Sequence, residues 1–398
     1  MPYHIEDQKK VAIISNNIAC DRNRHYVSQI EKYMKLNNWN VEESFEDVDK
    51  IIISACGFHH EMYKKIKNAL KIINENKFSF ADVILMGCLT RTHKSQLESE
   101  FNGQIIEFGK EEEINDIIKA KTSFHDVGEI NIFTTRLDDL RLKEDWFYIN
   151  IAKGCLCKCT YCVIKKAKGY IKSVPVKNIL QQYKTAMDLG FRKIFLGGED
   201  VFGYGIDIGS NIMNLLEDML LINDKVKFEF SYTNCVWLDK YGEGLLKLCK
   251  KGVFDQLNIP IQHVNDHVLT KMGRSANIKN TYKVIQSIKK ECPEILISTE
   301  IIVGFPGETD KDFQELLDFF KQDECFDGVT PIGYSDLKGT ISYKYNDKVD
   351  PHIISMRFER MNKILEDRSP YNQNPNIIYK LDAGNDFVFC KNSYIEKS

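Results

Sequence analysis

Three cysteines in the stretch KGCLCKCTYC have the spacing of a cluster-binding loop. Cys155, Cys159 and Cys162 form a C-x3-C-x2-C run. Three thiolates at this spacing can hold three of the four irons of a cubane iron–sulfur cluster. The fourth iron would then have no protein ligand. It could bind the amino and carboxylate groups of a small molecule and pass that molecule an electron.

Two other interpretations of the same run must be weighed. A tetrahedral zinc site would need four protein ligands, usually in two close pairs, and no second pair follows at a usual distance. Cys157 offers a rival register, in which Cys157, Cys159 and Cys162 would be the ligands. We prefer the register that begins at Cys155, in which the aromatic Tyr161 stands directly before the last cysteine.

The cysteine segment resembles the cluster motif of the radical S-adenosylmethionine (radical SAM) enzymes. Its form GC-x3-CTYC is close to the motif of the methylthiotransferases. The resemblance implies that Cys155, Cys159 and Cys162 bind the [4Fe–4S] cluster that cleaves SAM. These three cysteines are therefore the predicted catalytic residues.

The composition is that of an ordinary globular protein with room for two domains. The chain has 398 residues, of which 43% are hydrophobic and 28% charged, and its net charge of −3 gives no overall attraction to nucleic acid. No apolar run could span a bilayer, and the polar start MPYHIEDQKK lacks a signal-peptide core. Twelve cysteines without export signals indicate metal or redox chemistry in a reducing compartment. We therefore expect a cytoplasmic protein without a membrane partner.

The first third of the chain alternates short apolar runs with amphipathic stretches, which is typical of an α/β fold with an open parallel sheet of the flavodoxin-like kind. The predicted strands are Lys10–Ser15, Lys50–Ser54 and Val83–Met86. The predicted helices are Tyr26–Leu36, Glu61–Ile73 and Glu111–Ile118.

Three further cysteines fall at matching places in this pattern. Cys56 and Cys88 each follow a predicted strand directly, and Cys20 lies in the loop after the first strand. The carboxyl ends of parallel strands share one edge, where ligands usually bind. Each cysteine alone could be a small buried residue at a strand end. As a set of three beside a second cysteine motif, they favour a metal site.

This region is similar to the N-terminal domain of the methylthiotransferases. The matching segments are NIACDRNRHYVSQIEKYM at Cys20, IISACGFHHEMYKK at Cys56 and MGCLTR at Cys88. In that family the three cysteines bind an auxiliary [4Fe–4S] cluster that takes part in sulfur insertion. The chain departs from the family pattern by having Ser-Ala before Cys56 instead of Asn-Thr, and Ala before Cys20 instead of Gly. Both departures affect packing more than ligation.

Three histidines near these motifs are alternative ligands. They are His25, His59 and His60. Histidines of the surface or the core are more common than histidine ligands, so we take the cysteines as the ligands.

The rest of the chain divides into three predicted segments. Residues 121–145 are polar and aperiodic and are interpreted as a linker between an N-terminal domain, 1–120, and a second domain, 146–345. The second domain shows six strand–helix units, too few for a closed eight-stranded barrel. The resemblance implies the partial (βα)6 barrel of the radical SAM enzymes. Residues 346–398 should form a helix, 351–368, and a short tail, with too little chain for the TRAM domain that usually ends tRNA- and ribosomal-protein-modifying methylthiotransferases.

Polar residues at the ends of the predicted barrel strands would surround a bound nucleoside. In GGEDVFGYG, glycine allows close backbone approach, and two carboxylates could bind an amino group or ribose hydroxyls; a glycine turn with a capping Asp is the alternative. Arg274 resembles the family arginine near the SAM carboxylate, and its alternative is a surface arginine at a helix end. The predicted SAM contacts are Tyr161, Gly198, Glu199, Asp200, Ser231, Thr233, Gln262, Arg274, Ile302 and Val303.

One departure from the family lies beside the cluster motif. Where the family commonly has Pro and Arg-Gly, this chain has Lys165 and Lys168, and lysine cannot reproduce the bidentate geometry of arginine. Together with Lys166 they form a local basic patch, which could bind a phosphate or an acidic peptide or be an ordinary solvated surface.

The resemblance implies a reaction that replaces an unactivated C–H bond with C–S–CH3, using SAM and two [4Fe–4S] clusters. Because the chain is weakly acidic and lacks room for a TRAM domain, we expect a peptide or protein substrate rather than tRNA. A tRNA methylthiotransferase is the first alternative. The second is a radical SAM enzyme that inserts sulfur or forms a cross-link without methylation, or an electron-transfer protein. A reducing partner such as flavodoxin or ferredoxin is also expected.

Overall fold

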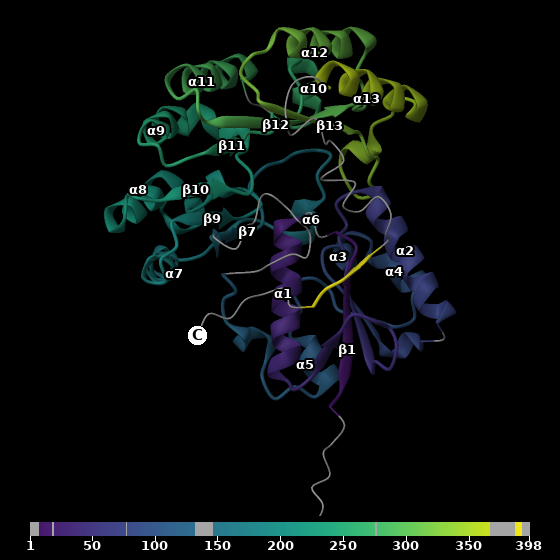
Figure 1. The fold of residues 1–398 in the computed structure, drawn as a ribbon. Coiled ribbons are helices and arrows are strands. Elements are labelled where there is room, and N and C mark those ends of the chain that lie inside the picture. Colours follow the sequence, from purple (N-terminus) through teal and green to yellow (C-terminus); the bar gives the residue numbers. More distant parts are fainter. Residues whose placement is uncertain are drawn as a thin grey trace, which may run out of the picture. The chain divides into compact units, whose positions relative to one another are not determined.

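The computed structural model describes residues 8–17, 20–76, 78–131, 146–274, 277–366 and 387–391. The chain forms two compact units (Figure 1). The first comprises Met1–Glu144, Lys166–Lys168 and Asn376–Ser398, and the second comprises Asp145–Lys165 and Gly169–Pro375. Each unit has its own sheet and its own covering helices.

The first unit is built on an open sheet in the order β2-β1-β3-β4-β5, with all four pairings parallel. This is the strand order of flavodoxin-like folds, and it confirms the predicted fold class. The short strand β14 adds to β1 in the antiparallel direction. The strands are β1 (Lys10–Ser15), β2 (Asn40–Glu42), β3 (Lys50–Ser54), β4 (Val83–Met86), β5 (Gln104–Ile105) and β14 (Val388–Phe389).

Both faces of this sheet are buried, because successive residues of a strand point to opposite faces. Val11 and Ile13 belong to a core with helices α1 (Asp21–Leu36) and α5 (Glu113–Ile118). Ala12 and Ile14 belong to a second core with α2 and α4. The remaining helices of this unit are α2 (His60–Glu75), α3 (Leu89–Thr92), α4 (Lys94–Glu100) and the 3-10 turns η1 (Phe80–Asp82) and η2 (Phe124–Val127).

Part of the segment predicted as a linker packs against helix α1. The side chain of Asn37 accepts a hydrogen bond from the backbone N–H of Lys121 at 2.7 Å. The ring of Phe124 lies 5.1 Å from the ring of Tyr33, and Val127 is buried in the core. Residues 132–145, the rest of the predicted linker, lie outside the described part of the chain.

The second unit contains six parallel strands in two three-stranded sheets, β6-β9-β10 and β11-β12-β13. A parallel bridge between Phe228 and Phe254 continues the first sheet into the second. The result is the open, partial barrel that was predicted. Its strands are β6 (Trp146–Asn150), β9 (Lys193–Gly197), β10 (Lys227–Phe230), β11 (Gln256–Asn258), β12 (Leu296–Val303) and β13 (Gly328–Gly333), and β7 (Ala152–Lys153) pairs with β8 (Lys172–Ser173) in a small separate hairpin.

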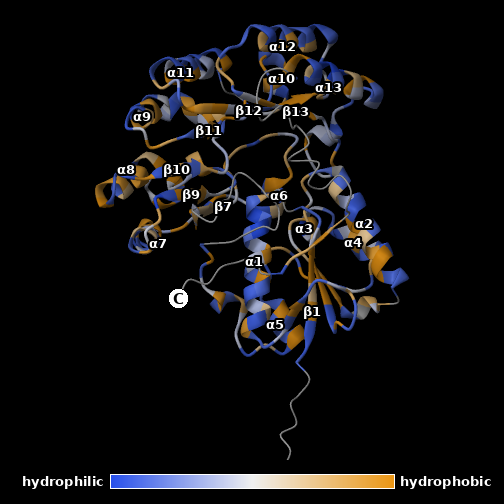
Figure 2. Ribbon diagram, in the orientation of Figure 1, coloured by the Kyte–Doolittle hydropathy of each residue, from blue (hydrophilic) through white to orange (hydrophobic). Residues whose placement is uncertain are grey.

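Helices connect and cover these strands. In Figure 2, β12 is mainly hydrophobic, whereas α11 and α12 carry both hydrophobic and hydrophilic residues, as helices with one buried face do. Thr309 and Asp312 form a capping box that fixes the start of α12. The helices are α6 (Ile164–Lys168), α7 (Val176–Asp188), α8 (Ile212–Ile222), α9 (Leu238–Lys250), α10 (Asp266–Lys271), α11 (Ile278–Glu291), α12 (Asp310–Gln322) and α13 (Pro351–Leu365), with 3-10 turns η3 (Val201–Gly203), η4 (Ile206–Ile208), η5 (Cys235–Trp237) and η6 (Ser342–Lys344).

None of the helices in the described part of the chain is both long enough and apolar enough to cross a membrane.

Candidate metal and cofactor sites

The three cysteines of the first unit lie at the carboxyl edge of its sheet. Cys56 follows β3, while Cys88 and Cys20 immediately precede α3 and α1. The backbone N–H groups of Asn23 and Arg24 bond to the carbonyl of Cys20, which fixes the first turn of α1. The strand order therefore brings these three cysteines to one edge of the sheet, as expected from the sequence.

The thiols of this edge are close enough to influence one another. Burial and the neighbouring thiols of Cys20 and Cys88 raise the pKa of Cys56 to about 12. The Asn17 amide donates a hydrogen bond to Cys56 Sγ at 3.3 Å, and Asn16 Oδ1 accepts one from the backbone N–H of Cys56 at 2.7 Å. A bound cation would favour the thiolate form that ligation requires. The donor set therefore fits an iron–sulfur cluster.

Of the alternative histidine ligands of this unit, His59 has another role in the structure. Burial lowers the pKa of His25 to about 4, so this side chain is neutral. The ring of His59 accepts a hydrogen bond from the backbone N–H of Glu61 at 3.3 Å and caps helix α2. The side chain of His60 lies outside the described part of the structure.

The cysteine loop of the second unit runs from the end of β7 to the start of α6. Removal from solvent and the neighbouring thiols of Cys159 and Cys155 raise the pKa of Cys162 to about 12. The backbone N–H of Ile164 donates to Cys162 Sγ at 3.4 Å, and that of Cys162 donates to the carbonyl of Cys159 at 3.2 Å. The loop thus brings the three predicted ligands together, as a cubane bound through three corners requires.

A glycine at the start of this loop has no room for a side chain. Gly154 has a φ of +86°, and a Cβ there would lie 2.4 Å from the carbonyl oxygen of Tyr170. Its backbone N–H donates to Glu199 Oε2 at 2.8 Å. The conformation and the close approach both require glycine.

The two carboxylates predicted to bind SAM also hold the loop. Glu199 accepts the Gly154 bond, and Asp200 is 1% exposed. Asp200 Oδ1 accepts a hydrogen bond from Trp237 Nε1 at 2.8 Å, while Oδ2 lies 3.6 Å from the sulfurs of Cys155 and Cys157. The structure therefore joins the segment after β9 to the cysteine loop.

Arg274 is buried inside the second unit and is not a surface residue. Its Nη1 donates to Asn234 Oδ1 at 2.6 Å, and its Nε donates to the hydroxyl of Tyr161 at 3.1 Å. Tyr161 stands between two predicted ligands, Cys159 and Cys162. A fixed positive charge next to the predicted cluster loop suits a carboxylate ligand.

The other predicted SAM contacts lie at strand ends. Ser231 Oγ accepts a hydrogen bond from the backbone N–H of Gly198 at 3.4 Å. Thr233 is buried, and its hydroxyl has no hydrogen-bond partner among the described residues, as expected of a group that bonds to a ligand. Gln262 has a φ of +67°, and such backbone strain is common at functional sites. Ile302 and Val303 are buried at the end of β12.

A buried ion pair after β12 was missed by the sequence analysis. Glu308 Oε1 accepts a hydrogen bond from Arg357 Nη1 at 2.8 Å, and Oε2 accepts one from the backbone N–H of Gly304 at 2.8 Å. Burial raises the pKa of Glu308 to about 7. No sequence signal connects these residues, because Arg357 lies on α13, far along the chain.

The lysines of the predicted basic patch are engaged with the protein. Lys165 Nζ donates to the carbonyls of Leu156 and Cys157, both at 3.3 Å, and lies 4.1 Å from the centre of the Tyr170 ring. Lys166 Nζ donates to the carbonyl of Thr92 at 2.7 Å. Lys165 thus helps to hold the cysteine loop, and Lys166 is bonded within the first unit, so neither is a free surface cation.

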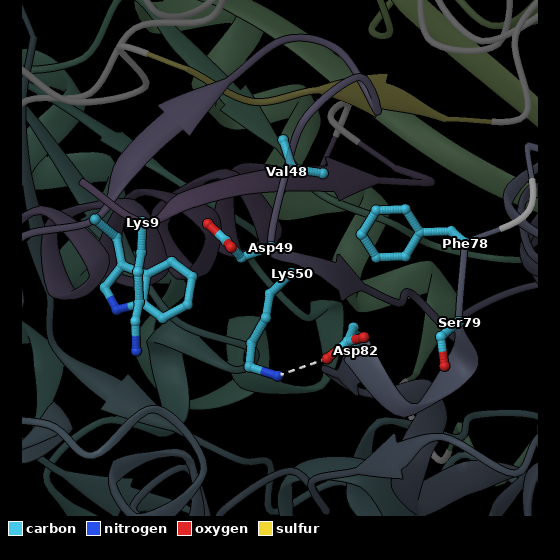
Figure 3. Close-up of a pocket in the computed structure, with 8 residues that line it drawn as sticks. Lys9, Val48, Asp49, Lys50, Phe78, Ser79 and Asp82 are labelled. Atoms are coloured by element: carbon cyan, nitrogen blue, oxygen red, sulfur yellow. Dashed lines mark hydrogen bonds and ion pairs between the residues drawn. The ribbon is translucent and has the colours of Figure 1, made fainter. Parts of the chain in front are cut away.

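A polar pocket lies at the amino edge of the first sheet, opposite its cysteines (Figure 3). Lys50, the first residue of β3, forms an ion pair with Asp82 there at 3.3 Å. The pocket is therefore not the predicted site. Its lining residues are Lys9, Trp39, Val48, Asp49, Lys50, Phe78, Ser79 and Asp82.

Two family models match the chain. The Radical SAM superfamily model matches residues 149–320, which contain the second cysteine motif. The model of the uncharacterized protein family UPF0004 matches residues 11–109, which contain Cys20, Cys56 and Cys88. The chain thus carries a radical SAM domain preceded by a UPF0004 domain.

Methylthiotransferases are similar to this chain over most of its length. The ribosomal protein uS12 methylthiotransferase RimO of Protochlamydia amoebophila is 26% identical over 91% of this chain and 78% of the relative. The probable threonylcarbamoyladenosine tRNA methylthiotransferase of Pyrococcus horikoshii is 26% identical over 84% and 79%. These relatives confirm the resemblance and the enzyme class. Radical SAM methylthiotransferases use SAM and two [4Fe–4S] clusters, in agreement with the expected cofactors.

Solved structures share the fold. The radical SAM methyltransferase TsrM of Kitasatospora setae, solved with cobalamin and a [4Fe–4S] cluster, has a TM-score of 0.55. It is 12% identical, and the match covers 82% of this chain and 75% of TsrM. The cobalamin-dependent radical SAM enzyme OxsB has a TM-score of 0.53 at 14% identity, over 88% of this chain and 56% of OxsB.

Proposed function

We propose that this chain, a radical SAM enzyme related to the methylthiotransferases, converts an unactivated C–H bond to C–S–CH3 on a peptide or protein. The observation that carries the proposal is the presence of two cysteine trios, one brought together at an edge of the first unit by the order of its strands and the other within a single loop of the second unit. One trio would serve SAM cleavage and the other sulfur insertion. A single cluster would suffice for a radical enzyme that transfers no sulfur.

The residues of the second unit would bind and orient SAM. Cys155, Cys159 and Cys162 would hold a [4Fe–4S] cluster, which when bound and reduced would supply the electron that cleaves SAM to the radical that removes hydrogen from the substrate. Arg274 would pair with the SAM carboxylate, and the buried hydroxyl of Thr233 would donate to the nucleoside. The apolar end of β12 would exclude water from the reactive centre.

The residues of the first unit would hold the sulfur source. Cys20, Cys56 and Cys88 would keep the auxiliary cluster at the carboxyl edge of the sheet, and Asn16 and Asn17 would fix the Cys56 loop through the bonds they make to it. A second SAM molecule supplies the methyl group by polar transfer.

A peptide or protein substrate is favoured over tRNA by charge. The net charge is −3, and binding to nucleic acid draws most of its affinity from lysine and arginine contacts to phosphates. Lys165 and Lys166 are engaged by backbone carbonyls. One relative is a ribosomal protein uS12 methylthiotransferase and another a probable tRNA methylthiotransferase, so both substrate classes have to be tested.

The test is anaerobic turnover with both substrate classes. Cluster-loaded protein, SAM and a reductant are incubated in parallel with isolated protein uS12, with a peptide mixture and with total tRNA, and the products are analysed by mass spectrometry. We expect a methylthio group on the peptide or protein together with S-adenosylhomocysteine. Modified tRNA with unmodified peptide would establish the tRNA alternative, and sulfur insertion without S-adenosylhomocysteine would establish the non-methylating alternative.

The setting of the reaction follows from its cofactors. Thiolate-bound clusters and a low-potential electron donor require a reducing compartment, so we place the enzyme in the cytoplasm with flavodoxin or ferredoxin as its reductant. Turnover supported by either protein in place of a chemical reductant tests this point.

A further inference from the structure

Three atoms in the second unit are close enough together to bind one metal ion. The sulfurs of Cys155 and Cys157 and a carboxylate oxygen of Asp200 all lie within 4.8 Å of one another, and no other such group occurs among the side chains that the structure describes. We propose that the cluster-free protein binds a single divalent cation of the zinc or ferrous type here. This site gives Cys157 a role that the three-cysteine cluster motif leaves open.

The distances agree with tetrahedral coordination. A zinc ion binds thiolate sulfur at about 2.3 Å and carboxylate oxygen at about 2.0–2.2 Å, so a sulfur and an oxygen on one tetrahedral ion lie about 3.6 Å apart. In the structure, Asp200 Oδ2 is 3.6 Å from Cys155 Sγ and 3.6 Å from Cys157 Sγ. The two sulfur–oxygen distances therefore match those of ligands on a single ion.

Neighbouring groups orient each ligand, as is usual around metal sites. Trp237 Nε1 donates to Asp200 Oδ1 at 2.8 Å, while Oδ2, which faces the two sulfurs, accepts the backbone N–H of Leu156 at 3.4 Å. The Asn234 amide donates to Cys157 Sγ at 2.8 Å, and the backbone N–H of Cys157 donates to Cys155 Sγ at 3.3 Å. Three protein ligands leave the fourth position of the ion open to water.

A divalent cation would also suit the charge of the site. Asp200 is 1% exposed, and no lysine or arginine among the described residues forms an ion pair with it. An anion that is buried without a partner is costly, and two adjacent thiolates would increase that cost. A divalent ion would offset all three charges. Protonated thiols are the other way to keep the site neutral, and they predict weak metal binding.

The single ion and the four-iron cluster exclude each other, because both need Cys155. The cluster would take Cys155 with Cys159 and Cys162, whereas the ion takes it with Cys157 and Asp200. Thiolate ligands bind zinc more tightly than ferrous iron. Zinc bound at this site would therefore slow cluster assembly, and removing the zinc would allow the cluster to form.

The first experiment titrates the anaerobic, cluster-free full-length protein with Co²⁺ and follows the absorption of cobalt–thiolate bonds. Cys157→Ser and Asp200→Asn should each lose one equivalent of bound cobalt or bind it at least tenfold more weakly. Cys159→Ala should retain that equivalent, and so should Cys249→Ser, a matched control at a buried thiol of α9. Loss in Cys159→Ala with retention in Cys157→Ser would overturn the proposal, and so would identical binding by all four variants.

A second experiment measures iron uptake during cluster reconstitution, with Zn²⁺ added beforehand. The wild type should take up iron more slowly after zinc treatment, whereas Cys157→Ser should be insensitive to zinc and reach the same final iron content. If zinc slowed iron uptake equally in both proteins, zinc would not be acting at the site that Cys157 forms with Cys155, and the proposal would be contradicted. Failure of the proposed enzymatic function would leave the cobalt result unchanged, so the two proposals fail independently.

Discussion

Arg357 Nη1 donates a hydrogen bond to Glu308 Oε1 at 2.8 Å, and both side chains are buried. The same carboxylate accepts the backbone N–H of Gly304 through its other oxygen. His263 lies nearby, with Nε2 3.8 Å from Glu308 Oε2, and burial lowers its pKa to about 3, so it stays neutral. Arg357 is therefore the cation that fixes the segment after β12, next to the predicted SAM contacts Ile302 and Val303.

Replacing Arg357 with Leu should strongly destabilise the second unit. It leaves the buried Glu308 carboxylate without its partner, a change that costs roughly 3–5 kcal/mol. The unfolding temperature should fall clearly. Arg360→Leu on the same helix removes an exposed hydrogen bond to Gln314 and a contact with the Phe313 ring at 5.2 Å but leaves no buried charge without a partner, so it should lower the unfolding temperature much less. Equal unfolding temperatures for the two variants would show that the buried pair is not important for stability.

The pH dependence of this defect follows from the Glu308 pKa, which is raised from 4.5 to about 7. Between these values the folded state holds a proton that the unfolded state releases, so this group's contribution to stability is lost as the pH rises through about 7. Arg357 lowers the pKa of Glu308, and its removal should raise that pKa further. Arg357→Leu should therefore lose more stability at pH 8 than at pH 5.5 in thermal unfolding, and a defect that is larger at pH 5.5 would contradict the assignment.

Gly154→Ala should disrupt the cysteine loop. The alanine Cβ would lie 2.4 Å from the Tyr170 carbonyl, in addition to the cost of about 1–2 kcal/mol for a left-handed conformation. Gly190→Ala is the matched control, since Gly190 has a φ of +87° and nothing near its Cβ position. After reconstitution we expect the iron content of Gly154→Ala to fall by about four per chain, and that of Gly190→Ala to match the wild type. Full iron in both variants would refute the steric argument.

Arg274→Lys should weaken SAM binding by roughly tenfold, or about 1.4 kcal/mol. A lysine cannot reach Asn234 and Tyr161 together, because these contacts use two separate nitrogens of the guanidinium. Calorimetry on cluster-loaded protein measures the affinity. Arg192→Lys, whose guanidinium bonds to the carbonyl of Phe191, should bind SAM normally. An unchanged SAM affinity in Arg274→Lys would remove Arg274 from the predicted contacts.

The strands that precede the cysteines could be predicted from the sequence because each is a continuous run of buried side chains. β1, β3 and β4 are runs of apolar residues bounded by polar ones, and their predicted limits match the structure. The strands β2, β5 and β14 have two or three residues each, too few to show a period. Their pairing depends on tertiary contacts that no local pattern contains.

The candidate site could likewise be predicted only in part from the sequence. Spacing and strand ends predicted the cysteines as ligands, because cluster binding requires a particular spacing and a common edge. The Asn234–Arg274–Tyr161 contacts and the Glu308–Arg357 pair join segments far apart in the chain, so no local pattern indicated them. The predicted linker was polar enough to suggest a loop, yet the contact of Phe124 with Tyr33 attaches it to α1.

The most direct test of the account is anaerobic iron counting, with Mössbauer spectroscopy, on the reconstituted wild type and two triple variants. The first carries Ala at Cys20, Cys56 and Cys88, and the second carries Ala at Cys155, Cys159 and Cys162. We predict about eight irons per chain in the wild type and about four in each variant, with different spectra for the two remaining clusters. A wild type that binds only four irons, all of them retained when the first trio is replaced, would contradict the two-cluster mechanism.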